Sequence, residues 1–402
     1  MSSQATGGHA PDRPLVAPPG LAGVVVADTS IGAVDGQAGR YHYRGHDAIE
    51  LARHRSVEEV WHLLLHGSLP DASRAAAFAA RIRDAARVPS ATLALLPGIV
   101  AASEKGAPLA DLRTAVSALA AELGVMASLD LDGDSLADQL IRLVAPQPEL
   151  VATLWRLGIG DGPVEPDDSL GFAGRYLHAL TGRRPSEAIV RALERYLVLT
   201  MDHGFNASTF AARVVTSTGA DAGAALVAAI GGLSGPLHGG APSRALDMLD
   251  EIGQPDRAAA WARAAVARGE RVMGFGHRIY RTRDPRAVLL KETATELGGP
   301  RVELAVAVED AIVDVLAEEK PGRKLYANVE FYAAVVLEAC GLPRELFTST
   351  FALSRAIGWS AHIREQHAEG RLIRPTARYV GMPTWADRPP GRGPLGSQRV
   401  AT

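Results

Sequence analysis

The sequence predicts an almost all-α protein with a minor pair of β-strands near its N-terminus. Apolar residues recur at every third or fourth position over most of the chain, which is the period of an amphipathic helix. Glycine or proline stands at nearly every junction between these stretches, as the ends and starts of helices require. The chain has 402 residues, which exceeds the usual size of a single domain, so we expect one large domain and one smaller domain.

Strand signals are confined to the N-terminal region, and helical signals follow. Two short segments rich in valine or tyrosine, 23–29 and 39–43, come first, and we expect them to pair as antiparallel strands. The predicted helices, in chain order, are 57–65, 112–119, 185–200, 222–233, 242–252, 257–268, 302–319, 330–340 and 352–369.

We expect flexible tails at the two ends of the chain, residues 1–20 and 386–402, because both segments are rich in glycine, proline and other small residues. The N-terminal tail lacks the charged start and apolar core of a signal peptide. A single cysteine, Cys340, excludes an internal disulfide and fits a reducing compartment. No apolar run reaches the roughly 18–20 residues of a membrane span. We therefore expect a cytoplasmic protein.

Charge and motifs exclude several classes of function. The net charge is −3 and no basic tract is present, so a nucleic-acid partner is not indicated. The sequence contains no HExxH or CxxC motif, and His362 and His367 are poorly spaced for one helical face, so we expect no catalytic metal. Phosphate-binding and dinucleotide fingerprints are also missing, as is the GxSxG elbow of a serine triad.

Two glycine-flanked histidines are the most informative features. His277 lies in the segment 273–286, and four arginines follow it within nine residues: Arg278, Arg281, Arg283 and Arg286. Guanidinium groups so close together repel one another unless they point into solvent or an anion lies among them. His238 lies in a second such turn, 235–241. Two turns of this kind in one chain indicate an active site.

His238 and Glu330 stand at the starts of predicted helices. The helix dipole disfavours the imidazolium form, so a neutral His238 is able to donate a hydrogen bond to a developing oxyanion. Glu330 follows Asn328, a plausible N-cap, and a glutamate there is ordinary helix chemistry. Its apolar neighbours, however, would desolvate the carboxylate and make it more basic.

Three further polar residues admit two interpretations each. His203 follows an apolar helix, where a lone histidine more often caps the helix than takes part in catalysis. Arg355 lies inside an apolar helix, so its charge needs a partner or an anionic ligand. Arg374 precedes a proline in an extended segment and, taken alone, is a surface arginine.

Together these segments resemble the citrate synthase family. The resemblance runs from about residue 20 to about residue 380, in the family's order. The matching segments are 20–45, 235–241, 273–286, 328–332, 354–359 and 374–375. The resemblance implies an all-α homodimer of the short form of the family. It also implies a large domain (21–238 and 342–385) and a small domain (239–341) that closes over the substrates.

The resemblance also implies the reaction and the role of each residue. Acetyl-CoA would condense with oxaloacetate, and hydrolysis of the thioester would give citrate and CoA, with no permanently bound cofactor. Glu330 would be the base, His238 the donor to the thioester oxygen, and His277 the group that polarises the ketone. The oxaloacetate carboxylates would be held by His203, Arg286, Arg355 and, from the partner subunit, Arg374. Coenzyme A would lie along Arg271 and Gly274 and near Lys324.

One residue departs from the family pattern. The usual base is aspartate in an Asn-Val-Asp-Phe sequence, whereas this chain has Glu330. Either the pocket has shifted to suit the longer side chain, or the chain is a weakened relative. Two alternatives to citrate synthase therefore stay open: a 2-methylcitrate synthase that uses propionyl-CoA, and a paralogue without activity that binds CoA or a dicarboxylate as a sensor.

Overall fold

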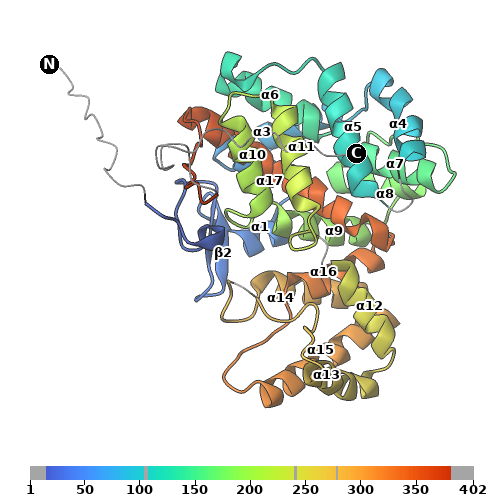
Figure 1. Cartoon of the computed structure of the whole chain (residues 1–402). Coiled ribbons are helices and arrows are strands. Elements are labelled where there is room, and N and C mark those ends of the chain that lie inside the picture. Colours follow the sequence, from blue (N-terminus) through green and yellow to red (C-terminus); the bar gives the residue numbers. More distant parts are fainter. Residues whose placement is uncertain (1–14, 104–106, 240–241, 278, 382–402) are drawn as a thin grey trace, which may run out of the picture. The chain divides into compact units, whose positions relative to one another are not determined.

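A computed structural model of the chain describes residues 15–103, 107–239, 242–277 and 279–381. These residues belong to two units (Figure 1). One unit comprises residues 15–27 and 373–381, and it is extended apart from the short 3₁₀ helix η1 (Pro19–Leu21). The other, Asp28–Leu372, contains all the remaining elements and the candidate site.

The described residues are mostly helical, which confirms the predicted fold class (Figure 1). The first helices are α1 (Ala48–His54), α2 (Val57–His66), α3 (Ala72–Ala85), α4 (Ser90–Ala102), α5 (Pro108–Glu122), α6 (Gly133–Val144), α7 (Gln147–Gly158), α8 (Phe172–Thr181) and α9 (Glu187–Thr200). They continue with α10 (Ala207–Thr216), α11 (Ala222–Leu233), α12 (Pro242–Ile252), α13 (Ala258–Ala267), α14 (Pro285–Leu297), α15 (Pro300–Glu319), α16 (Val329–Ala339) and α17 (Phe347–Glu369). Single 3₁₀ turns are η2 (Ser128–Asp130), η3 (Pro255–Arg257) and η4 (Arg344–Leu346).

The small sheet has three antiparallel strands, β1 (Gly32–Asp35), β2 (Arg40–Tyr43) and β3 (His46–Asp47). Strand β2 confirms the predicted strand 39–43, but the predicted strand 23–29 is wrong. Its valines have the right composition, yet the segment pairs with no described strand, and Val25 is exposed. Strand β2 pairs with β1 instead. At the end of β1, the Asp35 carboxylate accepts hydrogen bonds from backbone N–H groups of the turn that follows, which closes the hairpin.

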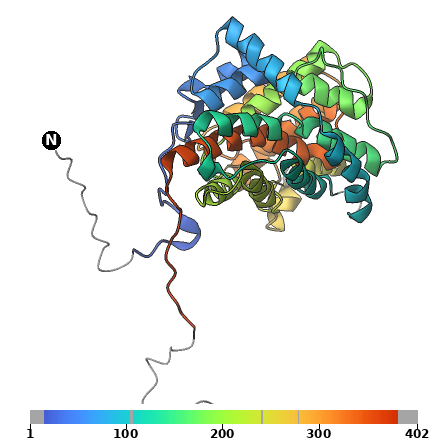
Figure 2. The ribbon, with the colours of Figure 1, turned by 90° about the horizontal axis from the view of Figure 1, so that it is seen from above.

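Helix α17 is the central element of Asp28–Leu372. Most of its side chains are buried, and it packs against α2, α6, α9, α10 and α11 (Figures 1 and 2). At Gly358 it meets the turn that follows α9, where a Cβ would lie 2.0 Å from the Met201 carbonyl oxygen. Only glycine permits this approach, which brings the polar residues of α17 beside those of the turn.

Helices α12 to α16 gather on one side of the same unit (Figure 1). Within this group α14 and α12 pack against α16, and α13 packs against α15, while α14 and α16 also contact α9. The predicted boundaries of the large and small domains stay a prediction. Among the described helices none alone is long and apolar enough to cross a membrane, and only α3 and α4, taken together as a bent pair, reach that length and composition.

Candidate active site

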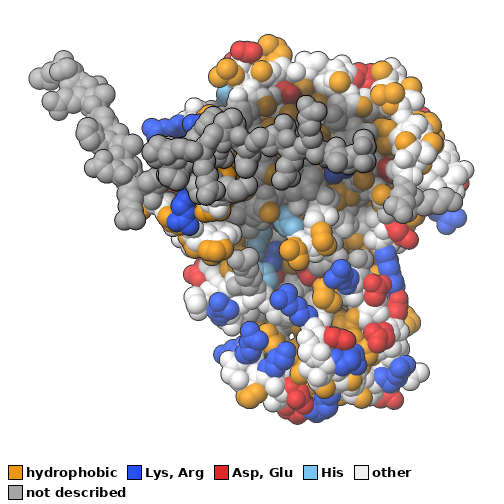
Figure 3. Space-filling model, viewed as in Figure 1, with side chains coloured by type: hydrophobic (Ala, Val, Ile, Leu, Met, Phe, Trp, Pro, Cys, Tyr) orange, Lys and Arg blue, Asp and Glu red, His pale blue; other side chains and the backbone are white. Residues whose placement is uncertain are grey.

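A cavity of about 330 Å³ lies where α9, α16, α17 and the two histidine turns meet. Figure 3 shows histidine side chains at a hollow near the middle of one face. Six of the predicted site residues line this cavity: His203, His238, His277, Arg286, Glu330 and Arg355. The rest of the lining consists of Tyr196, Thr200, Asn206, Leu237, Gly239, Ile279, Val329, Ala333 and Phe351.

The turn before His277 is tied to the segment before Glu330. Backbone hydrogen bonds run from Gly276 N–H to Tyr326 O (2.8 Å) and from Asn328 N–H to Gly274 O (2.8 Å). The Asn328 side-chain amide donates to Gly276 O (2.9 Å). Gly274 has a left-handed backbone (φ +79°), and a Cβ there would lie 2.9 Å from Phe331 Cβ. The base candidate and the histidine are therefore held on one hydrogen-bonded frame.

His277 is set up as a neutral N–H donor. Its Nδ1 accepts hydrogen bonds from the backbone N–H groups of Ile279 and Tyr280, both at 3.0 Å. The proton of the neutral ring is therefore on Nε2. Burial and the nearby Arg286 lower the pKa of His277 to about 4. Nη2 of Arg286 lies 3.3 Å from Nε2, a longer contact than the two backbone hydrogen bonds to Nδ1, and both side chains line the cavity.

Asp284 orients Arg286 and the start of α16 together. Its carboxylate accepts from Nε (3.0 Å) and Nη2 (2.8 Å) of Arg286, and also from the Val329 backbone N–H (3.1 Å). Asp284 was not among the predicted site residues, although an aspartate before Pro285 is a recognisable N-cap signal for α14. The carboxylate keeps the buried guanidinium charged and fixes it next to Glu330.

Arg355 is a buried cation without a partner. Its exposed fraction is 3%, and neither Nε nor Nη1 has a hydrogen-bond partner among the described residues. The guanidinium lies over the Phe351 ring at 4.8 Å. Leaving a buried donor unpaired costs about 1–3 kcal/mol, and more when it is charged. A carboxylate ligand in the cavity would remove that cost.

His203 and His238 are both neutral, mainly because they are buried. Burial and the positive charges of Arg286 and Arg355 hold the pKa of His203 well below its usual range, and its Nε2 lies 3.0 Å from the Tyr280 hydroxyl. Burial, with Arg355, also lowers the pKa of His238. The direction of this shift is the one expected for His238, but its main cause is burial and not the helix dipole. Its Nε2 lies 2.8 Å from Ser208 Oγ and 3.4 Å from the Ser208 backbone nitrogen.

Glu330 is a poorly solvated carboxylate at the start of α16. The predicted N-cap is confirmed, because Asn328 Oδ1 accepts from the Glu330 backbone N–H (3.0 Å). The carboxylate itself has no hydrogen-bond partner among the residues that the structure describes. Burial raises its pKa, against the opposing effect of Arg286. A carboxylate of this kind is available to take up a proton.

The remaining predicted residues do not line the cavity. Arg271 and Lys324 are exposed, and Gly274 lies in the buried turn. Lys324 instead lines a second cavity of about 470 Å³ together with Arg53 and Arg283. Arg374 belongs to the other unit, where it is exposed. The predicted roles of these residues in binding CoA and the dicarboxylate stay predictions, and Arg278 lies outside the described residues.

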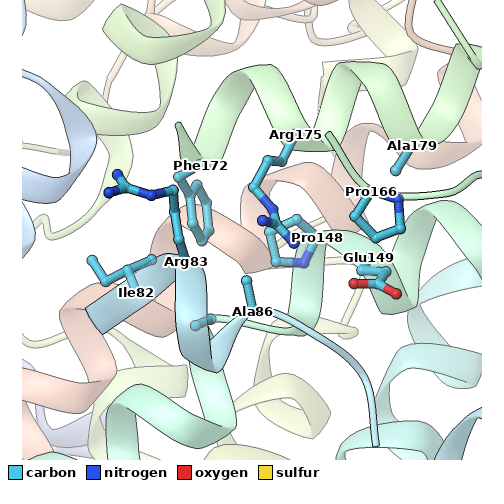
Figure 4. A pocket seen from close by; sticks show the side chains of 10 residues that line it. Ile82, Arg83, Ala86, Pro148, Glu149, Pro166, Phe172, Arg175 and Ala179 are labelled. Carbon is cyan, nitrogen blue, oxygen red and sulfur yellow. The ribbon is translucent and has the colours of Figure 1, made fainter. Parts of the chain in front are cut away.

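A much smaller cavity of about 20 Å³ lies between α3, α7 and α8 (Figure 4). Phe172, Pro148 and Ala86 make most of its wall apolar, and Glu149 stands at one side. This volume holds about one water molecule, so it is not a substrate site. Across the described ranges, no group of three or more His, Cys, Asp or Glu side chains is arranged to hold a metal ion.

The family model and the similar proteins that match this chain agree with one another. Residues 20–376 match the family model described as citrate synthase, C-terminal domain. The chain is 40% identical to citrate synthase of Haloferax volcanii over 90% of its own length and 95% of the relative, and 39% identical to 2-methylcitrate synthase of Mycobacterium tuberculosis over 90% of each.

Solved structures are similar too. Citrate synthase from Pyrobaculum aerophilum matches with a TM-score of 0.82 at 33% identity, over 96% of this chain and 99% of that one. The Thermoplasma acidophilum citrate synthase, solved as a ternary complex with carboxymethyl coenzyme A and oxaloacetate, also gives a TM-score of 0.82, at 29% identity over 91% and 97% of the two chains.

Proposed function

The chain belongs to the citrate synthase family, and on this premise we propose that it condenses acetyl-CoA with oxaloacetate and releases citrate and CoA. The observation that carries the proposal is the composition of one cavity. Among the described residues, it combines a buried guanidinium with two unpaired donors, two neutral imidazole donors and a carboxylate without a hydrogen-bond partner. The reaction needs a cradle for a dianion, donors for two carbonyl oxygens and a base for a weakly acidic methyl group.

Oxaloacetate occupies the part of the cavity nearest the arginines. Arg355 binds one carboxylate through the donors that have no other partner, and Arg286 binds the other. His277 donates from Nε2 to the ketone oxygen, which makes the carbonyl carbon more electrophilic. His203 contributes a neutral donor to the same dianion.

Glu330 removes a proton from the acetyl methyl group. Its pKa is raised by burial, which makes it a stronger base than an exposed glutamate. His238 donates to the thioester oxygen as the enolate forms, and the enolate carbon attacks the ketone. Closure of the small domain over the substrates would exclude bulk water from these groups until the thioester is hydrolysed.

The coenzyme portion lies outside this cavity in our proposal. Its phosphates bind along Arg271 and near Lys324, and Gly274 allows the backbone to approach the ligand. The Thermoplasma relative binds a coenzyme A derivative together with oxaloacetate, which supports this class of ligand.

We also propose a homodimer whose sites are shared, with Arg374 of one subunit completing the dicarboxylate site of the other. The family resemblance is the support for this assembly. A cytoplasmic location and a place in the tricarboxylic acid cycle follow from the same function, and the buried single thiol of Cys340 fits a reducing compartment.

A second candidate is 2-methylcitrate synthase, which one similar protein from Mycobacterium tuberculosis is named as. The wall of the cavity next to Glu330 is formed by Val329 and by Ala333, one turn further along α16. Ala333 is small, so this wall does not obstruct the extra methyl group of a propionyl chain.

Free-thiol release with oxaloacetate, measured side by side for acetyl-CoA and propionyl-CoA, tests these proposals. Rapid release from acetyl-CoA is the expected result; it establishes citrate synthase activity and shows that Glu330 in place of the usual aspartate does not prevent it. A clear preference for propionyl-CoA moves the assignment to 2-methylcitrate synthase. No release from either by the folded dimer, with oxaloacetate binding retained, identifies a sensor paralogue.

A further inference from the structure

A second buried carboxylate, Asp202, lies beside the cavity but is not one of its ligands. Its exposed fraction is 2%, and it directly precedes His203 in the chain. Oδ1 lies 3.1 Å from Nε2 of His362, and Oδ2 accepts from the Gly204 backbone N–H at 3.2 Å. Both oxygens are therefore occupied by donors other than an arginine.

His362 is locked in the tautomer that suits Asp202. Its Nδ1 lies 3.2 Å from Nη1 of Arg213, a guanidinium with an exposed fraction of 0%. Since the arginine can only donate, Nδ1 accepts and Nε2 carries the proton toward Asp202. Arg213 is in turn fixed by Glu365 (2.6 Å) and Gln366 (3.0 Å). The orientation of His362 is thus set by groups remote from the cavity.

Arg355 and His362 share one face of α17, because they are seven residues apart, close to two helical turns. Gly358 stands between them, where α17 meets the backbone of Met201 and the Cβ of Asp202. The negative charge of Asp202 acts on Arg355 and helps it stay charged despite its burial. Yet the two side chains form no hydrogen bond, and the guanidinium keeps two unpaired donors.

We propose that His362 is a positioning residue for the dicarboxylate: by holding Asp202, it prevents that carboxylate from pairing with Arg355. The guanidinium then stays charged and open for a substrate carboxylate. This inference rests on the proposed function, since it takes Arg355 to be a ligand of oxaloacetate. Without the hydrogen bond from His362, Asp202 competes with the substrate carboxylate for the donors of Arg355.

The test measures oxaloacetate affinity by calorimetry without acyl-CoA, and KM and kcat by thiol release. For His362→Leu we expect Kd and KM for oxaloacetate to rise about tenfold or more, because a guanidinium paired for nine-tenths of the time is open for one-tenth. The value of kcat at saturating oxaloacetate and KM for acetyl-CoA should change little. A purely structural defect would also lower kcat and raise KM for acetyl-CoA.

Three further variants isolate the cause. His362→Gln retains an N–H donor and should restore affinity. Adding Asp202→Asn to His362→Leu should also restore it, because a neutral amide does not compete for a guanidinium. Trp359→Phe perturbs the buried packing of α17 without touching Asp202, and it serves as the matched control.

The inference is overturned if folded His362→Leu binds oxaloacetate as the wild type does, or if the double variant is no better than the single one. If His362→Leu does not fold, the single variant Asp202→Asn provides the test. Its affinity for oxaloacetate should equal or exceed that of the wild type, and a large loss of affinity would contradict the proposed role of His362. Oxaloacetate binding without thiol release in the wild type overturns the proposed function alone, whereas absence of binding overturns both.

Discussion

At the scale of single residues, the candidate site is defined by which buried charges have partners and which do not. Arg286 is held by both oxygens of Asp284, while Arg355 and Glu330 have no hydrogen-bond partner for their side chains in the described part of the chain. Buried polar groups are almost always satisfied in folded proteins. Arg355 and Glu330 also line the same cavity, so ligand atoms there are able to complete both side chains.

The first prediction concerns Glu330. Glu330→Gln should lower kcat by about 10³-fold, because a neutral amide does not accept the methyl proton, while oxaloacetate affinity stays close to wild type. Glu330→Asp, which restores the family's usual residue, should cost about 10²-fold if the cavity is shaped for the longer side chain. Thiol-release kinetics and calorimetry measure these effects. Near-normal turnover of Glu330→Gln would show that another group is the base.

The pH dependence should follow Glu330, because the pKa values of the cavity histidines are all lowered. Glu330 must be ionised, and its pKa is raised, so kcat/KM should fall as pH falls through that pKa. His277, with a pKa of about 4, is already neutral throughout the accessible range. The acid limb of the plot of kcat/KM against pH should therefore show the small enthalpy of ionisation of a carboxyl group. A limb with the larger enthalpy of an imidazole would contradict this assignment.

Sequence patterns located most of the candidate site but not what orients it. His277 and His238 were visible because glycines flank them, and Arg355 because a charge interrupts an apolar helix. Asp202 and Asp284 were missed, since their importance comes from partners that only the fold brings near, such as His362, 160 residues away in the chain. Local sequence does not contain that information.

At the scale of elements, the reliability of prediction followed the strength of local signals. The ranges 222–233 and 242–252 match α11 and α12, where periodicity and boundary residues agree. Helices α3 and α6 were not predicted, although aspartate N-caps open both. The segment 23–29 failed as a strand because composition alone does not supply a pairing partner.

The turn before His277 gives a prediction at this scale. Gly274→Ala should cost about 1–2 kcal/mol for its left-handed backbone, and further stability because the new Cβ meets Phe331. It should also displace His277 from Glu330 and lower kcat. Gly269→Ala is the matched control: its φ is +73°, but a Cβ there would meet nothing within 4 Å. Equal losses of thermal stability and activity in both variants would contradict the packing argument.

At the scale of the whole molecule, one buried acid acts against the stability of the fold. Glu194 of α9 is largely buried beside Glu58, and Arg191 lies 3.5 Å away. Burial and the Glu58 charge raise the pKa of Glu194 to about 7. The folded state therefore binds more protons than the unfolded state, and its stability falls as pH rises from the ordinary glutamate range through about 7.

Replacing Glu194 by glutamine should remove that penalty. At pH 8 we expect Glu194→Gln to raise the free energy of unfolding by about 1–3 kcal/mol, with the gain shrinking toward zero at pH 4–5. Urea unfolding at the two pH values measures it. Glu187→Gln, on the exposed first turn of the same helix, should show no such dependence. A gain of equal size at both pH values would contradict the electrostatic explanation.

The assembly leads to the most demanding prediction. If Arg374 completes the site of the partner subunit, Arg374→Ala and His277→Ala damage different halves of each site, and each homodimer has low activity. A one-to-one mixture of dissociated and reassembled subunits contains about half heterodimers, each with one intact site, so activity should recover to about a quarter of wild type. If Arg374 served its own subunit, every site in the mixture would keep a defect. Thiol release before and after subunit exchange distinguishes the two arrangements, and the absence of recovery after verified exchange would mean that the site is not shared.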